Sequence, residues 1–154
     1  MISVDHEKIW ELLYVRRLID SEAAALAAAK ATDEQIEGLM TFLSEVKSLG
    51  TDNIVEKREG GRLYAKFYND LADATNNTIF SHLMKSISSM LRGGLPYSRT
   101  KLQSVPESSR AIYEQHVAIL NAIKEHQPEK AREAMRAHID WLEDNLKRIL
   151  MESK

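Results

Sequence analysis

The 154-residue sequence predicts an all-α protein, an antiparallel bundle of six or seven helices. Apolar residues recur at helical spacing along most of the chain, and no segment shows the apolar-polar alternation of a half-buried strand. The connections between these periodic segments are short and contain residues that start and end helices. A chain of this length can bury a sizeable core, so we expect residues 1–154 to form a single domain.

Start and stop signals divide the chain into helices. Thr32 followed by Gln35 resembles a capping box that opens the second helix. Gly60 and Gly61 are weak helix formers, so we expect a kink or a short break inside the third helix. Residues 93–106 form the longest irregular stretch and are interpreted as a loop within the domain. The first three expected helices span residues 5–31, 33–49 and 53–74. The fourth is capped by Asn76 or Asn77 and ends before Gly93, and the last two span residues 106–126 and 128–151.

Composition and charge exclude several classes of function. The 21 basic and 23 acidic side chains give a formal net charge of -2 without a long run of one sign, so this chain is not expected to grip a nucleic-acid backbone itself. The absence of cysteine excludes disulfides and thiolate metal sites and fits a reducing cytoplasm. No signal peptide or membrane-spanning apolar run is present, so no membrane contact is expected. We do not expect an enzyme, because a phosphate-binding glycine loop, a cysteine nucleophile and paired Glu-x-x-His motifs are all absent.

Two histidines lie on the apolar stripes of their own expected helices. His116 stands between Ile112 and Ile119 in one helix, and His138 follows Met135 in the next. A buried imidazole must find a hydrogen-bond partner, a metal ion or a ligand, because an unsatisfied buried polar group costs about 1–3 kcal/mol. Since the two helices are consecutive, both rings can face one cavity. Two separately satisfied core histidines are the simpler alternative.

Four segments of the chain, taken in order, carry a family resemblance. They are VRRLIDSEAAALAAAKATDEQI, FYNDLADATNNTIF, EQHVAILNAI and PEKAREAMRAH. Together with the separation of His116 from His138, they resemble the FCD-type ligand-sensing domain of GntR-family bacterial transcription regulators, over about Leu12 to Leu150. The resemblance implies an all-α domain that binds an effector and dimerises. A stand-alone helical interaction module and a helical metal-binding protein are the alternatives.

The resemblance also implies an effector-binding arginine. An Arg on the first helix of the family commonly helps to hold an anionic effector, and the matching residue here is Arg16, with Asp20 four residues later. A small carboxylate is the implied effector, because a guanidinium and phenolic donors suit one. The alternative is an exposed pair between Arg16 and Asp20, which would contribute only about 0.3–0.5 kcal/mol.

The metal site of the family is only half present in this sequence. The family takes an Asp and a His four residues apart on one helix, and one His from each of two later helices. The later pair matches His116 and His138, but Tyr64 stands at the Asp position and Tyr68 at the first His position. The four-residue spacing is kept, so both phenols are expected to point the same way. Neutral tyrosine has a pKa near ~10 and is a poor zinc or nickel ligand, so a divalent metal is less expected here than in the family.

Several interpretations of this site remain open. Tyr64, Tyr68, His116 and His138 can hydrogen-bond an effector directly, without a metal ion. The two histidines can instead hold a weak divalent ion together with water or the effector, or the tyrosines can ionise onto ferric iron. A purely structural role in the core is the remaining interpretation. For the effector site we expect these four side chains and Arg16 to converge on one internal cavity.

The resemblance implies two partners, which are DNA and a second copy of the chain. Its members carry an N-terminal winged helix-turn-helix domain, whereas here the sensing bundle begins almost at Met1. We therefore expect part of a longer regulator rather than a stand-alone sensor, with DNA contacted only through the attached domain. A homodimer is also implied, because such regulators read two half-sites with two-fold symmetry. The Ala-rich first helix and the fourth helix are the candidate dimer seams.

Overall fold

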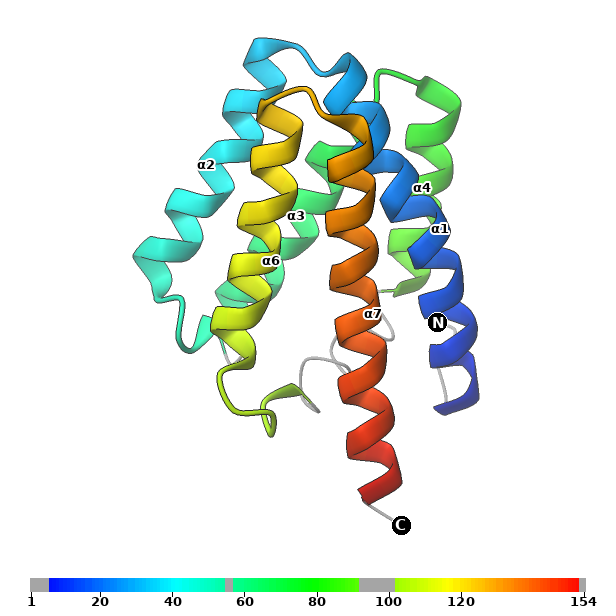
Figure 1. Cartoon of the computed structure of the whole chain (residues 1–154), viewed down its shortest axis with the longest axis vertical. Helices are drawn as coiled ribbons and strands as arrows, with labels where there is room; N and C mark the ends of the chain where they lie inside the picture. The colour runs from blue at the N-terminus through cyan, green and yellow to red at the C-terminus, as the bar shows by residue number, and fades with distance from the viewer. Residues whose placement is uncertain (1–5, 55–56, 92–101, 153–154) are drawn as a thin grey trace.

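The chain folds into a bundle of antiparallel helices (Figure 1). The computed structural model describes residues 6–54, 57–91 and 102–152. Successive helices alternate in direction, and these described residues contain no strand, which confirms the all-α bundle expected from the sequence. No helix in the described ranges is long and apolar enough to cross a lipid bilayer. The helices are α1 (His6–Lys30), α2 (Asp33–Leu49), α3 (Arg58–Ala74), α4 (Thr78–Leu91), α6 (Ser108–Lys124) and α7 (Pro128–Glu152).

Helices α1 and α7 form the most extensive pair of the bundle. Helix α6 packs on α7 and α1, and α2 covers α3 and α6 at one edge. Helix α4 lies at the opposite edge, where it packs on α3 and touches α1 (Figure 1). The interior is therefore bounded mainly by α1, α3, α6 and α7, which come from the beginning, the middle and the end of the sequence.

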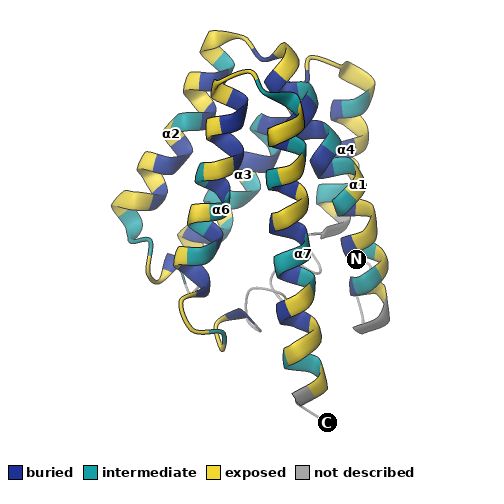
Figure 2. Cartoon of the chain, in the orientation of Figure 1, coloured by how far each residue is buried: buried dark blue, intermediate teal, exposed yellow. Residues whose placement is uncertain are grey.

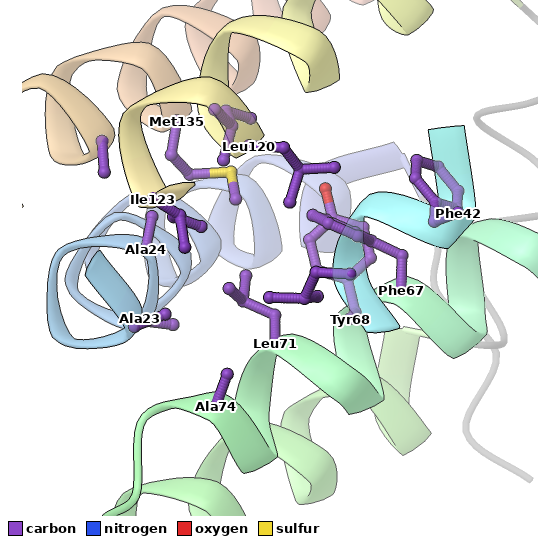
Figure 3. Packing of buried hydrophobic residues seen from close by; sticks show 14 of the residues in the cluster. Ala23, Ala24, Phe42, Phe67, Tyr68, Leu71, Ala74, Leu120, Ile123 and Met135 are labelled. Atoms are coloured by element: carbon purple, nitrogen blue, oxygen red, sulfur yellow. The ribbon is translucent and has the colours of Figure 1, made fainter. Parts of the chain in front are cut away.

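One end of this interior is built largely from alanine. The absence of longer side chains lets helices approach closely, and every alanine of the group is fully buried. Figure 3 shows Ala23, Ala24 and Ala74 of this group beside the larger side chains of α3, α6 and α7. We call the group the alanine layer; its members are Ala23, Ala24, Ala27, Ala28, Ala72, Ala74 and Ala131.

The capping box predicted at the start of α2 is present. The Thr32 side chain accepts a hydrogen bond from the backbone N–H of Gln35, and the Gln35 side chain accepts one from the backbone N–H of Thr32. The same Gln35 amide donates to the backbone oxygen of Asp73 and to the side chain of Asn76. The cap therefore also ties the start of α2 to the end of α3.

The expected kink at Gly60 and Gly61 is wrong, because both glycines lie in the first turn of α3. This helix begins at Arg58, five residues later than expected, and runs unbroken to Ala74. A Cβ atom on Gly60 would lie only 2.1 Å from the backbone oxygen of Ile54. Glycine is required here because the preceding turn packs directly against the start of the helix.

The fifth expected helix, residues 106–126, also begins later than the sequence indicates. Helix α6 starts at Ser108, after Glu107, whose φ of 58° is left-handed. Residues 93–101 of the expected loop lie outside the described residues. Residues 103–106 of that stretch form turns and bends, in agreement with an irregular segment.

Apolar side chains remain on the outer surface of α1 and α4. Tyr14 and Leu18 of α1 are exposed, as are Ile79 and Leu83 of α4 (Figure 2 shows the exposed positions in yellow). Each pair is spaced by four residues, so each occupies one face of its helix. The Ala-rich part of α1, expected as a dimer seam, is instead buried inside this chain by its packing on neighbouring helices.

Candidate functional site

Arg16 lies inside the bundle although its side chain is charged. The residue is 5% exposed, and Asp20, one turn later on α1, is 3% exposed. The Arg16 Nε donates to Asp20 Oδ2 at 3.0 Å, and its Nη2 donates to the Tyr68 hydroxyl at 3.0 Å. The expected alternative of an exposed surface pair is therefore wrong: the pair is buried and linked to α3.

Burial opposes both charges of this pair. Burial alone would lower the pKa of Arg16, but the contacts with Tyr68 and Asp20 outweigh this effect and raise the pKa. Burial raises the pKa of Asp20, while Arg16 opposes the shift by favouring the ionised carboxylate. Each charge therefore depends on the other, and the pair is neutral as a unit.

The two histidines pack against one another at the interface of α6 and α7. Their ring centroids are 4.6 Å apart, and His116 and His138 are only 1% and 2% exposed. The His116 Nδ1 lies 2.8 Å from the backbone oxygen of Ile112, and the His138 Nδ1 lies 2.6 Å from Gln115 Oε1. Because these oxygens only accept, each Nδ1 carries the proton and each neutral ring keeps its lone pair on Nε2.

Both imidazoles resist protonation. Burial lowers the pKa of His116 to about 4, although its hydrogen bond to Ile112 acts the other way. Burial, together with His116 and Arg16, places the pKa of His138 well below its ordinary value. At neutral pH the two rings are therefore uncharged hydrogen-bonding groups.

The two tyrosines of α3 approach the histidines from the other side. The centroid of the His116 ring lies 4.8 Å from the ring centroid of Tyr64 and 6.2 Å from that of Tyr68. Tyr68 is bonded by Arg16, but the Tyr64 hydroxyl and His116 Nε2 are buried without a hydrogen-bond partner among the described residues. Burial raises the pKa of both hydroxyls, that of Tyr68 to about 12.

The structure thus brings all five predicted site residues into one group, drawn from four helices. Figure 3 shows Tyr68 of this group within the core, close to Phe67 of the same helix. Two surface hollows lie elsewhere, one between the start of α6 and the second half of α7 and the other at the start of α4. We call the group the polar cluster; its members are Arg16, Asp20, Tyr64, Tyr68, Gln115, His116 and His138.

Sequence reasoning missed Gln115 as a member of this cluster. It precedes His116 on α6 and is only partly buried, so no apolar periodicity marks it. Its side chain nevertheless fixes the tautomer of His138. A glutamine beside a buried histidine stripe is the signal that was available, but it is a weak one.

The polar cluster offers a divalent metal ion two imidazoles but no free carboxylate. No group of three or more His, Asp or Glu side chains suited to a metal occurs within the described residues. The carboxylate of Asp20 is already held by Arg16, and the phenols are neutral, so only the two imidazoles keep a nitrogen that could bind a metal ion. The raised pKa of Tyr64 and Tyr68 also opposes the phenolate form that ferric iron would need.

Comparison with known protein families identifies the class of this domain. Residues 11–140 match the FCD domain, and the chain belongs to this family. It is 34% identical over 141 residues to the HTH-type transcriptional regulator LutR of Bacillus subtilis, covering 91% of this chain and 63% of that protein. It is 31% identical over 126 residues to the HTH-type transcriptional repressor NanR of Escherichia coli, covering 82% of this chain and 46% of NanR. The chain therefore spans less than two thirds of the length of these relatives.

Solved structures show the same fold. E. coli McbR/YncC superposes with a TM-score of 0.73 at 17% sequence identity, covering 98% of this chain and 68% of that chain. Streptococcus agalactiae GntR gives a TM-score of 0.66 at 22% identity, covering 90% and 57%. At these identities the likeness establishes the fold alone. With the family match, it confirms the resemblance to the FCD domains of GntR-family regulators seen in the sequence.

Proposed function

We propose that this chain is the effector-binding domain of a bacterial transcription regulator, whose attached winged-helix domain binds DNA. Membership of the FCD family and the similarity to LutR and NanR support this role. The observation that carries it is the polar cluster, because a buried ion pair beside two unpartnered polar atoms destabilises a core that apolar residues could fill. Such an arrangement is expected where a protein binds a ligand.

The proposed effector is a small organic acid bound through Arg16. A guanidinium has five N–H donors in a planar fork, so one that bonds Asp20 and Tyr68 keeps donors for a second carboxylate. In this proposal Arg16 holds the carboxylate of the effector, while Tyr64, Tyr68, His116 and His138 contact the rest of it. The role is binding rather than catalysis, in keeping with relatives that are named as transcription regulators.

The proposed signal is a shift between two arrangements of the regulator. An effector changes the affinity for DNA only by as much as it binds one arrangement more tightly than the other. The balanced charge of this chain supports the view that DNA is contacted by the attached domain. A regulator of this kind acts in the bacterial cytoplasm, which is the location we propose.

We also propose that two copies associate through α1 and α4. Tyr14, Leu18, Ile79 and Leu83 are exposed on these two helices, which touch one another at the edge of the bundle. Leu18→Glu together with Leu83→Glu is expected to convert a dimer to a monomer in sedimentation experiments, whereas Met151→Glu, at another exposed apolar site, is expected to leave the dimer intact. A monomeric parent chain at high concentration would contradict this assembly.

Thermal unfolding with a panel of small carboxylic acids tests the sensing role. An acid present at ten times its Kd is expected to raise the free energy of unfolding by about 1.4 kcal/mol. The variant Arg16→Met with Asp20→Leu removes both charges together and is expected to lose this response, while the surface variant Arg17→Met keeps it. A parent chain that no small anion stabilises, but that captures a partner helix, would instead support a plain interaction module.

A further inference from the structure

Two buried polar atoms of the polar cluster are not used by the fold. The His116 Nε2 carries a lone pair, because its Nδ1 donates to Ile112, and it therefore needs a donor. The Tyr64 hydroxyl can donate and accept, yet it also has no partner within the described part of the chain. Their rings are in edge contact, with centroids 4.8 Å apart. Since about 90% or more of buried polar groups in proteins are hydrogen-bonded to protein or to a bound molecule, two such atoms on adjacent rings mark a place where a bound molecule would complete the hydrogen bonding.

We propose that His116 Nε2 and the Tyr64 hydroxyl recognise a hydroxyl group of the ligand directly, without a metal ion. The inference rests on the proposed effector-binding function and adds the chemical group that this end of the site selects. A ligand hydroxyl donates to His116 Nε2 and accepts from the Tyr64 O–H, so it satisfies both atoms with one group.

Other ligand groups fit this pair of atoms less well. An ionised carboxylate only accepts, so it leaves the lone pair of His116 Nε2 unpaired and suits Arg16 instead. An ammonium group can donate to both atoms, but it leaves the Tyr64 O–H without an acceptor and adds a second positive charge to a cluster that already holds the buried Arg16. A divalent metal would find only two imidazoles here, because Asp20 is held by Arg16 at 3.0 Å and both phenols stay protonated. The ligand is therefore an acid that carries a hydroxyl on the side that meets α3 and α6.

The ligand-free protein provides the first test, because Tyr64 and Tyr68 form a matched pair on one helix. Tyr64→Phe removes a hydroxyl without a partner and is expected to leave the melting temperature unchanged or raise it by a few degrees. Tyr68→Phe removes the hydroxyl that accepts a hydrogen bond from Arg16, and this variant is expected to have a lower melting temperature. Nitrogen NMR is expected to find the His116 proton on Nδ1. Equal destabilisation by the two variants, or a proton on Nε2, would overturn the inference.

Matched acids provide the second test. Malate against succinate and lactate against propionate differ only by a hydroxyl, and we expect the hydroxylated member to bind at least ten times more tightly in calorimetry with a chelator present. Tyr64→Phe is expected to abolish this preference, whereas Tyr14→Phe on the exposed face of α1 keeps it. Equal binding within each pair overturns the inference but leaves the sensing role intact. If none of the four acids binds, the small-acid proposal fails for this set, and the ligand-free test alone judges the inference.

Zinc titration provides the third test. Tyr64→His adds a third imidazole and keeps the contact of Tyr68 with Arg16, and Tyr64→Asp with Tyr68→His restores the complete ligand set of the family. At least one of these variants is expected to bind zinc a hundredfold more tightly than the parent chain. Tight zinc binding by the parent, with a hydroxyl preference that the chelator removes, would overturn the metal-free site. No gain in either folded variant would overturn the shared placement of these side chains.

Discussion

The alanine layer and the polar cluster are neighbouring regions of one interior, but they are packed in opposite ways. Fully buried alanines bring the helices into close contact in the first region. In the second region, rings, a buried ion pair and two unpartnered polar atoms fill the space between α1, α3, α6 and α7. The comparison shows how a small bundle can hold destabilising groups: close packing at one end fixes the helices that present them at the other.

Breaking the ion pair is expected to have the largest effect on stability. Asp20→Ala leaves the Arg16 charge buried without its anion and is expected to lower the free energy of unfolding by about 3–5 kcal/mol. The matched control is Asp140→Ala, which breaks the half-exposed pair with Arg17 and is expected to lose less than about 1 kcal/mol. Urea denaturation measures both. Similar losses for the two variants would mean that burial does not distinguish the pairs.

Overpacking the alanine layer is expected to rank second. Ala27→Leu inserts three carbon atoms where the residue is fully buried and is expected to destabilise the domain by about 1–3 kcal/mol. Ala29→Leu, at an exposed position of the same helix, is the control. The midpoints of urea unfolding compare the two variants when the unfolding free energy of both falls with urea concentration at the same slope. An Ala27→Leu variant as stable as Ala29→Leu would show that the layer has spare room.

Low pH is expected to destabilise the fold through the buried histidines of the polar cluster. The pKa of His116 is lowered to about 4 in the fold, so between its ordinary 6.5 and 4 the unfolded chain binds a proton that the folded chain does not. This contribution is fully present above pH 6.5 and is lost as the pH falls, by about 2 kcal/mol at pH 5. Urea midpoints at pH 7.5 and 5 measure it, and His138 acts in the same direction.

Replacing the titrating ring tests the cause of that acid sensitivity. His116→Phe keeps an aromatic ring but cannot bind a proton, so the variant is expected to lose less stability between pH 7.5 and 5 than the parent. His82→Gln, at an exposed site on α4, serves as the control. Parallel pH profiles for the parent and His116→Phe would assign the acid sensitivity to other groups.

Removing the cap beside the alanine layer is expected to have the smallest effect. Thr32→Ala eliminates the acceptor for the Gln35 backbone N–H and is expected to cost about 1 kcal/mol, since the rest of the box and the packing of α2 remain. Thr41→Ala, on the exposed surface of the same helix, is the comparison. Thermal unfolding measures both variants. A loss as large as that of Asp20→Ala would mean that this cap, rather than the packing, holds the layer together.

The sequence predicts the features that depend on local patterns. Helical periodicity placed His116 and His138 on buried stripes, and the capping box placed the start of α2, because neighbouring residues alone determine both. The family resemblance indicated Arg16, Tyr64 and Tyr68, and the structure brings them to the same cluster.

Features that depend on packing between distant segments were not predictable in this way. Whether the Arg16 pair is buried, and which phenol it bonds, depends on how α1 meets α3. The role of Gln115 depends on the position of α7, and the exposure of Ile79 and Leu83 depends on α4 lying at the edge. The same limit explains the error at Gly60, where helix propensity suggested a kink but a contact with Ile54 decides the outcome.

That contact has a consequence for the geometry of the site. Gly60 packs closely against the Ile54 carbonyl, and this contact limits how far α3 can shift along its own axis. Tyr64 and Tyr68 follow one and two turns further along the same rigid rod. A larger side chain at position 60 would have to displace either Ile54 or the start of α3, and a shift of α3 would move both phenols together relative to the histidines.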